Sequence, residues 1–266
     1  MDHALIRSQM PTLVAGHVPR NARSFKFNVY DGTPQKTMLG FAADPSPFQG
    51  KVIAVTDDAI VVKVKPTQFA VVDRHLVTAV PAEGSKVEVI PYARRHFDGQ
   101  RVGTPREKTE YLADGRPYTV KSVILGDATT ELPVPQARCP ELAELIQQLQ
   151  KLPAPDGHRY ISHLLVDANA RDFSLVDPKP HDIIATPPSI RFTVETGKFS
   201  GQVTVSYDRG GDVYVVELHR DGESVERVDD VYFDDLGDTL ERLIDDGSWR
   251  LIRVETLSGK ARSVRH

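Results

Sequence analysis

Residues 51–73 read KVIAVTDDAIVVKVKPTQFAVVD and determine the fold that we expect for the front of the chain. Three runs rich in β-branched residues are separated by Asp57-Asp58 and by a turn at Pro66, and a fourth run, KVEVI, follows at 86–90. β-branched residues favour strands, whereas Asp, Pro and Gly favour turns. The pattern predicts at least four antiparallel strands within residues 49–92, forming a small SH3-like antiparallel β-barrel over residues 47–92.

A second β-rich unit is expected in residues 187–266. The runs IRFTVE, GQVTVSYD and DVYVVELH are joined by glycine-containing turns, and WRLIRVETL (249–257) reads as a last strand. Before that strand, Asp234-Asp235 precede a helix whose apolar positions fall on one face, at Leu236, Leu240, Leu243 and Ile244. The order of these elements predicts a C-terminal α+β domain in which one helix packs on an antiparallel sheet.

The remaining segments are less regular. Residues 1–46 form an N-terminal segment that is expected to be poorly structured over its first 22 residues, with a strand at 24–30. Residues 93–186 comprise a basic connection and a middle α+β region, with a helix beginning at Pro140 and a strand-like run at 160–167. The whole chain is therefore expected to be α+β and β-rich.

Composition limits the classes of protein to which the chain can belong. It has 33 Lys/Arg and 37 Asp/Glu, a net charge of −4, but residues 1–110 carry +4 and residues 111–266 carry −8. The single Cys139 excludes an intramolecular disulfide and fits a reducing cytoplasm. No run of 18 apolar residues and no secretory signal is present, so a cytoplasmic protein without a membrane span is expected.

Two segments resemble domains of known families. The stretch 47–92, with its Gly-Lys-Val-Ile opening at Gly50, FAVVDRHLV (69–77) and VPAEGSKVEVIPY (80–92), resembles the KfrB-type domain of conjugative-plasmid proteins. The sequence VSYDRGGDVYVVELHRDGE (205–223), within 190–257, resembles an accessory domain of the polyvalent proteins of mobile elements. Both resemblances imply a mobile genetic element and a role in plasmid maintenance, DNA handling or defence evasion. Neither implies catalytic residues.

A basic stretch after residue 91 is the candidate nucleic-acid site. Cations beside aromatic rings are what single-strand binders use for phosphate contact and base stacking. The simpler alternative is a solvated loop whose arginines pair with nearby acids such as Asp98 and Glu107. The candidate residues, including lysines of the predicted barrel, are Lys51, Lys63, Lys65, Tyr92, Arg94, Arg95, Phe97, Arg101 and Arg106.

Residues 221–246 suggest an alternative function, because they hold 11 Asp/Glu and 2 Arg. A row of carboxylates along the predicted helix could imitate the phosphates of a duplex and bind a host DNA-binding protein as an anti-defence inhibitor. The simpler reading is a solvated helix face with acidic N-capping residues. The residues that would form the protein-binding surface are Asp235, Asp238, Glu241 and Asp245.

Catalytic and metal-binding signatures are weak. Cys139 precedes a helix but lacks a family signature, and the spacing of His158 and His163 would place them on opposite faces of a strand. We therefore expect no cofactor and no metal site, and an enzyme is not favoured. The sequence favours an accessory protein that acts by macromolecular recognition, with nucleic acid as the leading partner and a host or plasmid protein as the alternative.

Overall fold

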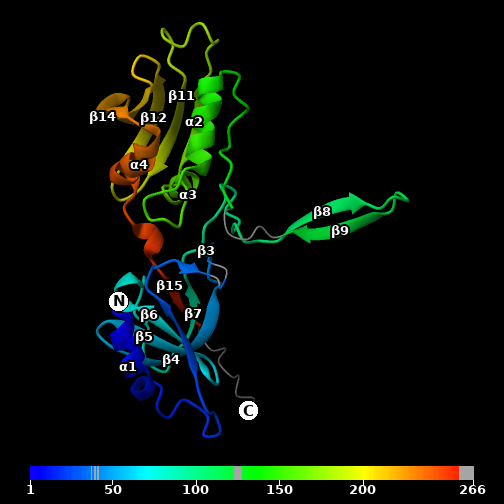
Figure 1. Cartoon of the computed structure of the whole chain (residues 1–266). Helices are drawn as coiled ribbons and strands as arrows, with labels where there is room; N and C mark the ends of the chain where they lie inside the picture. The colour runs from blue at the N-terminus through cyan, green and yellow to red at the C-terminus, as the bar shows by residue number, and fades with distance from the viewer. Residues whose placement is uncertain (37, 39, 41, 123–127, 258–266) are drawn as a thin grey trace, which may run out of the picture. The chain divides into compact units, whose positions relative to one another are not determined.

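The computed structural model describes residues 1–36, 38, 40, 42–122 and 128–257 (Figure 1). The chain divides into two compact units, each described by itself. The first unit comprises Met1–Gln35, Asp44–Ala93 and Arg250–His266, and the second comprises Lys36–Ala43 and Arg94–Trp249. Strands predominate over helices, and the two largest sheets are antiparallel except at one strand pair. The expected α+β, β-rich class is therefore confirmed.

A six-stranded sheet forms the first unit. Its spatial order is β1 (Lys26–Tyr30), β6 (Gln68–Asp73), β5 (Ala59–Lys65), β4 (Phe48–Val55), β7 (Lys86–Ile90) and β15 (Arg253–Thr256). Strand β1 runs parallel to β6, and all the other pairs are antiparallel. The four antiparallel strands expected within 49–92 are confirmed. However, β1 and β15 remain separate edges and no described sheet closes, so the expected SH3-like barrel is not confirmed.

Helix α1 (His3–Leu13) packs against one face of this sheet, in residues that we expected to be poorly structured. The Asp2 carboxylate caps the helix by accepting the amide protons of Ala4 and Leu5, at 2.8 and 3.1 Å. Ile6 and Met10, one turn apart, enter a cluster with strands β5 and β6. The expectation was wrong because Pro11 resembles a helix breaker in sequence, although it lies in the last turn of the helix.

The other face of the sheet buries a second cluster, to which the end of the chain contributes. Ile252 and Val254 join Val52, Val62 and Val89 in this cluster. Strand β15 pairs with β7 of the first unit and not with the meander, so the prediction that it belongs to the C-terminal sheet is wrong. A strand pattern reports which residues are extended, but it does not identify the sheet edge with which the strand pairs.

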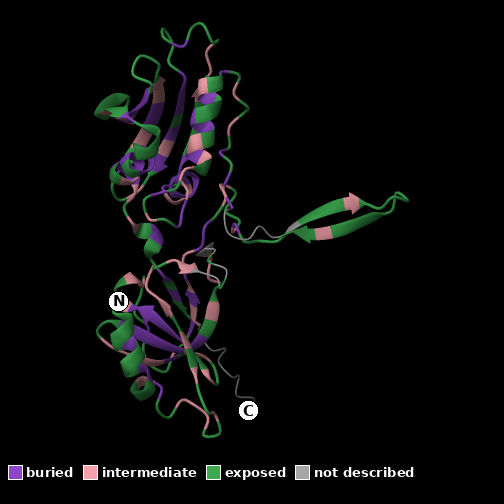
Figure 2. Cartoon of the chain, in the orientation of Figure 1, coloured by how far each residue is buried: buried purple, intermediate pink, exposed green. Residues whose placement is uncertain are grey.

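The second unit is a five-stranded antiparallel sheet with helices on one face (Figures 1 and 2). Helices α2 (Pro140–Lys151), α3 (Ile161–Asp167) and α4 (Leu236–Ile244) share one apolar core with alternate residues of the sheet. The expected meander and its packed helix α4 are confirmed. The run 160–167 contains a helix and not a strand. The strands, in spatial order, are β10 (Arg171–Val176), β11 (Ser189–Glu195), β12 (Ser200–Asp208), β13 (Val213–Arg220) and β14 (Glu223–Val231).

The second unit also carries a hairpin, and the domain boundary expected at residue 187 falls inside this unit. Strands β8 (Arg106–Tyr111) and β9 (Pro117–Ser122) pair with each other and are largely exposed (Figure 2). The remaining elements are short: β2 (Gln35–Lys36), β3 (Ala42–Ala43), and the 3₁₀ turns η1 (Arg74–Leu76), η2 (Phe233–Asp235) and η3 (Ser248–Arg250).

Candidate nucleic-acid interface

Three lysines lie side by side across neighbouring strands of the first unit. Lys51 of β4 lies opposite Lys63 of β5 on one side and opposite Lys86 of β7 on the other. Directly opposed residues point to the same face of a sheet, and successive residues point to opposite faces. The adjacent Val62 and Val87 point into the buried cluster that β15 completes. The three lysines therefore share the other face, the one that α1 covers farther along β5.

No acid neutralises this row among the residues that the structure describes. Lys51 and Lys86 are exposed, and the Lys63 ammonium donates a hydrogen bond to the main-chain oxygen of His17, in the segment after α1. At the next opposed position, Gln49 donates from Nε2 to the Glu88 carboxylate at 3.3 Å. Like charges directly opposite one another destabilise a sheet, so the row carries an energetic cost in the isolated protein.

A second pair of lysines lies at the same end of the sheet. Gln68, the first residue of β6, lies opposite Lys26 of β1 and opposite Lys65 of β5, and both lysines are exposed. The next residue, Phe69, packs in the cluster under α1, so this second pair points to the opposite face of the sheet from the row. We call the five residues together the lysine end: Lys26, Lys51, Lys63, Lys65 and Lys86. The first unit has 14 Lys/Arg and 9 Asp/Glu, whereas the second has 19 and 28, so the basic character belongs to the first unit.

The arginine-rich segment does not form the exposed patch that the sequence predicts. Arg94 is only 3% exposed and donates from Nη1 to the His158 main-chain oxygen at 3.4 Å. Phe97 packs against the core of the second unit, with its ring 5.3 Å from that of Phe173 in an edge-to-face arrangement. Arg94 is therefore not placed for contact with a ligand in solvent, whereas half-buried Phe97 lines a cavity of about 470 Å³ in the second unit. The sequence shows that Arg94 lies in a polar segment, but it does not show that the guanidinium is buried and donates a hydrogen bond to a main-chain oxygen.

The other residues of the predicted patch divide between the two units. Tyr92 is half-buried after β7 in the first unit. In the second unit, Arg95 is exposed and donates to the Gly99 main-chain oxygen at 2.8 Å, while half-buried Arg101 forms a backbone bridge with it. Arg106 begins β8, and its side chain lies outside the described part of the structure. Of the predicted residues, the structure brings Lys51 together with Lys63 in the first unit and Arg95 together with Arg101 in the second.

The acidic row expected on helix α4 is not formed as predicted. Asp235 and Asp238 are exposed, and Glu241 is half-buried. Asp245 follows the last residue of the helix and forms an ion pair with Arg159. Its carboxylate is therefore engaged inside the second unit, and a duplex-mimicking row through Asp245 is not available.

Arg159 is a buried cation that no sequence motif singles out. Its side chain has no exposed surface, pairs with Asp156 at 2.8 Å, with Asp167 at 2.9 Å and with Asp245, and lies 4.1 Å from the ring centre of Trp249. Burial lowers the pKa of a guanidinium, but the three carboxylates outweigh it, so the pKa of Arg159 is raised. The cluster joins α3, α4 and the loop between α2 and α3, which indicates a structural role.

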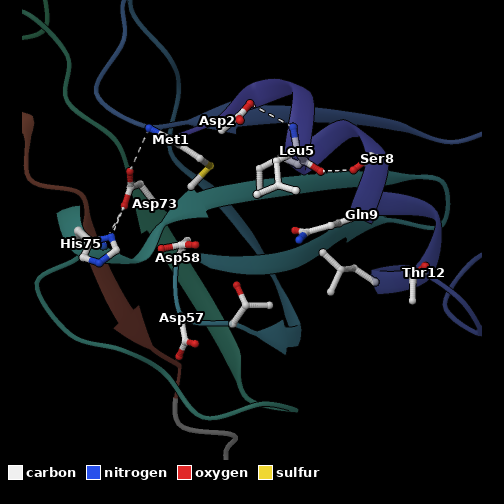
Figure 3. A pocket seen from close by; sticks show the side chains of 13 residues that line it. Met1, Asp2, Leu5, Ser8, Gln9, Thr12, Asp57, Asp58, Asp73 and His75 are labelled. Atoms are coloured by element: carbon white, nitrogen blue, oxygen red, sulfur yellow. Dashed lines mark hydrogen bonds and ion pairs between the residues drawn. The ribbon is translucent and has the colours of Figure 1, made fainter.

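A cavity of about 750 Å³ in the first unit has the opposite charge to the lysine end. It is lined by the start of α1 and by Asp57, Asp58, Asp73 and His75 (Figure 3). The Asp73 carboxylate accepts the His75 amide proton at 2.9 Å and lies 3.9 Å from the amino group of Met1. The cavity has four aspartates in all, Asp2 included, which make it unfavourable for phosphate, so it does not extend the lysine end.

Cys139, the single cysteine, is poorly placed to act as a nucleophile. Cys139 is fully buried before α2 and its thiol donates to the Glu141 carboxylate at 3.1 Å. Burial raises the pKa of this thiol, which disfavours the reactive thiolate. Over the described ranges, no group of three or more potential ligands is arranged to hold a metal ion. None of the helices in those ranges has the length and apolar character needed to cross a bilayer.

Comparison with known proteins yields no relative: no protein-family model, no curated protein and no solved structure matches the chain.

Proposed function

We propose that this protein binds nucleic acid through the lysine end of its first unit. The observation that carries the proposal is the position of Lys51, which lies opposite Lys63 and Lys86 on the two neighbouring strands. Lysine ammonium groups bind phosphate as point charges, and a phosphate backbone supplies closely spaced negative charges to a row of them. Binding of a polyanion would remove the repulsion that the row carries when the protein is alone.

Neighbouring strands of a sheet lie about 4.8 Å apart, so three opposed lysines span about 10 Å at their Cα atoms. Lysine side chains are long and flexible, so this row would contact two or three phosphates without fixing a sequence. We therefore expect the contact to be sequence-independent and sensitive to salt. In the setting that the plasmid-domain resemblance implies, such binding would serve DNA handling or plasmid maintenance.

The test is fluorescence anisotropy with a labelled oligonucleotide of about 20 nucleotides at low ionic strength. The protein should bind, and a triple variant with Lys51→Gln, Lys63→Gln and Lys86→Gln should bind at least tenfold more weakly. Lys179→Gln is the matched control, because Lys179 is an exposed lysine of the second unit. Equal affinities for the triple variant and the wild type would overturn the proposal, as would the absence of wild-type binding.

A further inference from the structure

A cavity of about 420 Å³ adjoins the lysine end within the first unit. Three aromatic side chains line it: Phe27 and Tyr30 of β1, and Phe48 at the start of β4. The Tyr30 and Phe48 rings lie 5.0 Å apart between centres at an interplanar angle of 34°. All three residues are half-buried, so part of each remains accessible from the cavity.

Polar groups at the rim of this cavity are of the kind that recognise a base edge. Asn28 and Gln68 line the cavity and are exposed. Their amides offer both donors and acceptors, as the hydrogen-bonding edge of a nucleobase does. Pro45 and Pro47 line the same cavity and contribute no N–H donor to it.

Two cations of the lysine end, Lys26 and Lys65, adjoin this cavity on the face of the sheet away from α1. Lys26 lines it and lies opposite Gln68, which in turn lies opposite Lys65. Aromatic side chains beside a track of cations are the combination by which proteins hold single strands, with bases stacked and phosphates paired. A duplex keeps its bases stacked on one another and would leave this cavity unused.

We infer that the cavity holds an unpaired base of a single strand whose adjoining phosphates pair with Lys26 and Lys65. The inference rests on the proposed function and narrows it to single-stranded nucleic acid. Aromatic grooves also bind proline-rich peptides, but the adjoining lysines favour a polyanion over such a peptide.

The experiment compares three labelled probes of equal length: oligo(dT) of about 20 nucleotides, an abasic strand with the same phosphates, and a duplex. The wild type should bind oligo(dT) at least tenfold more tightly than the abasic strand. A double variant with Tyr30→Leu and Phe48→Leu keeps apolar volume against the core but removes both rings, and it should lose this preference. Loss of stacking on two rings corresponds to about a tenfold or larger change in affinity. Tyr111→Leu, at an exposed tyrosine of the second unit, is the control and should keep the preference.

The outcomes separate this inference from the proposed function. Equal binding of oligo(dT), abasic strand and duplex by the wild type would overturn the base cavity while leaving the lysine end intact. Unchanged preference in the double variant would also overturn it. Equal binding of the abasic strand by the double variant and the wild type would show that the variant is folded. If a proline-rich peptide displaces oligo(dT) from the wild type but does not bind the double variant, the cavity is a peptide site and the inference is wrong. If no probe binds the wild type, the proposed function itself fails.

Discussion

Val254 lies directly opposite Val89 in an antiparallel pair, although 165 residues separate them in the chain. This pair attaches the last described strand, β15, to β7 in the sheet that carries the lysine end. Both faces of that sheet therefore depend on chain ends: α1 covers one face, and β15 contributes Ile252 and Val254 to the cluster on the other. The lysine end is therefore supported by a unit whose segments lie far apart in the sequence.

Truncation of Ile252 should destabilise the first unit. Ile252 is 2% exposed, so Ile252→Ala is expected to cost about 2–5 kcal/mol through lost burial and the cavity left behind. Leu251→Ala is the matched control, because Leu251 is 45% exposed and should change stability by less than about 0.5 kcal/mol. Urea denaturation gives the midpoints, and hydrogen exchange at the β7 amides locates the loss in the first unit. Equal midpoints for the two variants would contradict the assignment of β15.

Removal of the Arg159 guanidinium should destabilise the second unit strongly. Arg159→Ala would leave the carboxylates of Asp156, Asp167 and Asp245 without their cation, which is expected to cost about 3–5 kcal/mol. Arg171→Ala provides the comparison, because Arg171 forms an exposed ion pair with Glu195 at 3.0 Å and should cost about 0–1 kcal/mol. Chemical denaturation measures both. A loss for Arg159→Ala no greater than that for Arg171→Ala would show that the cluster does not hold the unit together.

The same cluster predicts a loss of stability in acid. Burial raises the pKa of Asp156, but the Arg159 charge and the amide protons of Arg159 and His158 lower it more, so the net pKa is lowered. A carboxyl whose folded pKa lies below its unfolded value stabilises the fold above about pH 4 and loses that contribution as pH falls through the folded pKa. Asp156→Asn, measured by urea denaturation at about pH 6 and pH 3, should therefore show a smaller decrease in midpoint than the wild type. Parallel decreases would contradict the prediction.

The lysine row should weaken the isolated fold. Like charges directly opposite one another repel, so Lys51→Gln should raise the free energy of unfolding by a few tenths of a kcal/mol while weakening oligonucleotide binding. Thermal unfolding at low salt measures the gain, and high salt should reduce it because exposed charges are screened. A decrease in stability that persists in salt would indicate that Lys51 contributes packing and that the row carries no repulsive cost.

The strands of both units could be predicted from sequence because their β-branched runs are bounded by turn residues, as at Asp57-Asp58. Strands β5 and β6 are buried on both faces because α1 covers one of them. The sequence did not predict this burial, because Pro11 suggested that the segment containing α1 was not helical. The edge chosen by β15 depends on contacts distant in the chain. These parts of the fold are tertiary and have no local signature.

The candidate site could be predicted only in part, because its residue types are visible in the sequence and their spatial neighbours are not. Lys51, Lys63 and Lys65 could be named from the sequence as lysines of predicted strands. That Lys51 lies opposite both Lys63 and Lys86 depends on the strand register, which the sequence does not show. Arg94 and Phe97 were chosen by residue type, and the structure places them in the second unit, where burial and core packing occupy them. The Arg159 cluster joins residues up to 89 positions apart, from Asp156 to Asp245, which no motif records.

The salt dependence of oligonucleotide binding tests the central claim most directly. Each phosphate neutralised on a single strand contributes about −0.7 to the slope of log affinity against log salt concentration. We predict that single, double and triple Lys→Gln variants at Lys51, Lys63 and Lys86 reduce the magnitude of the slope in steps, by about 0.7 for each lysine removed. Lys179→Gln should leave the slope unchanged. A slope that is the same in the wild type and the triple variant would contradict the account, because the lysine row would then make no contact with phosphate.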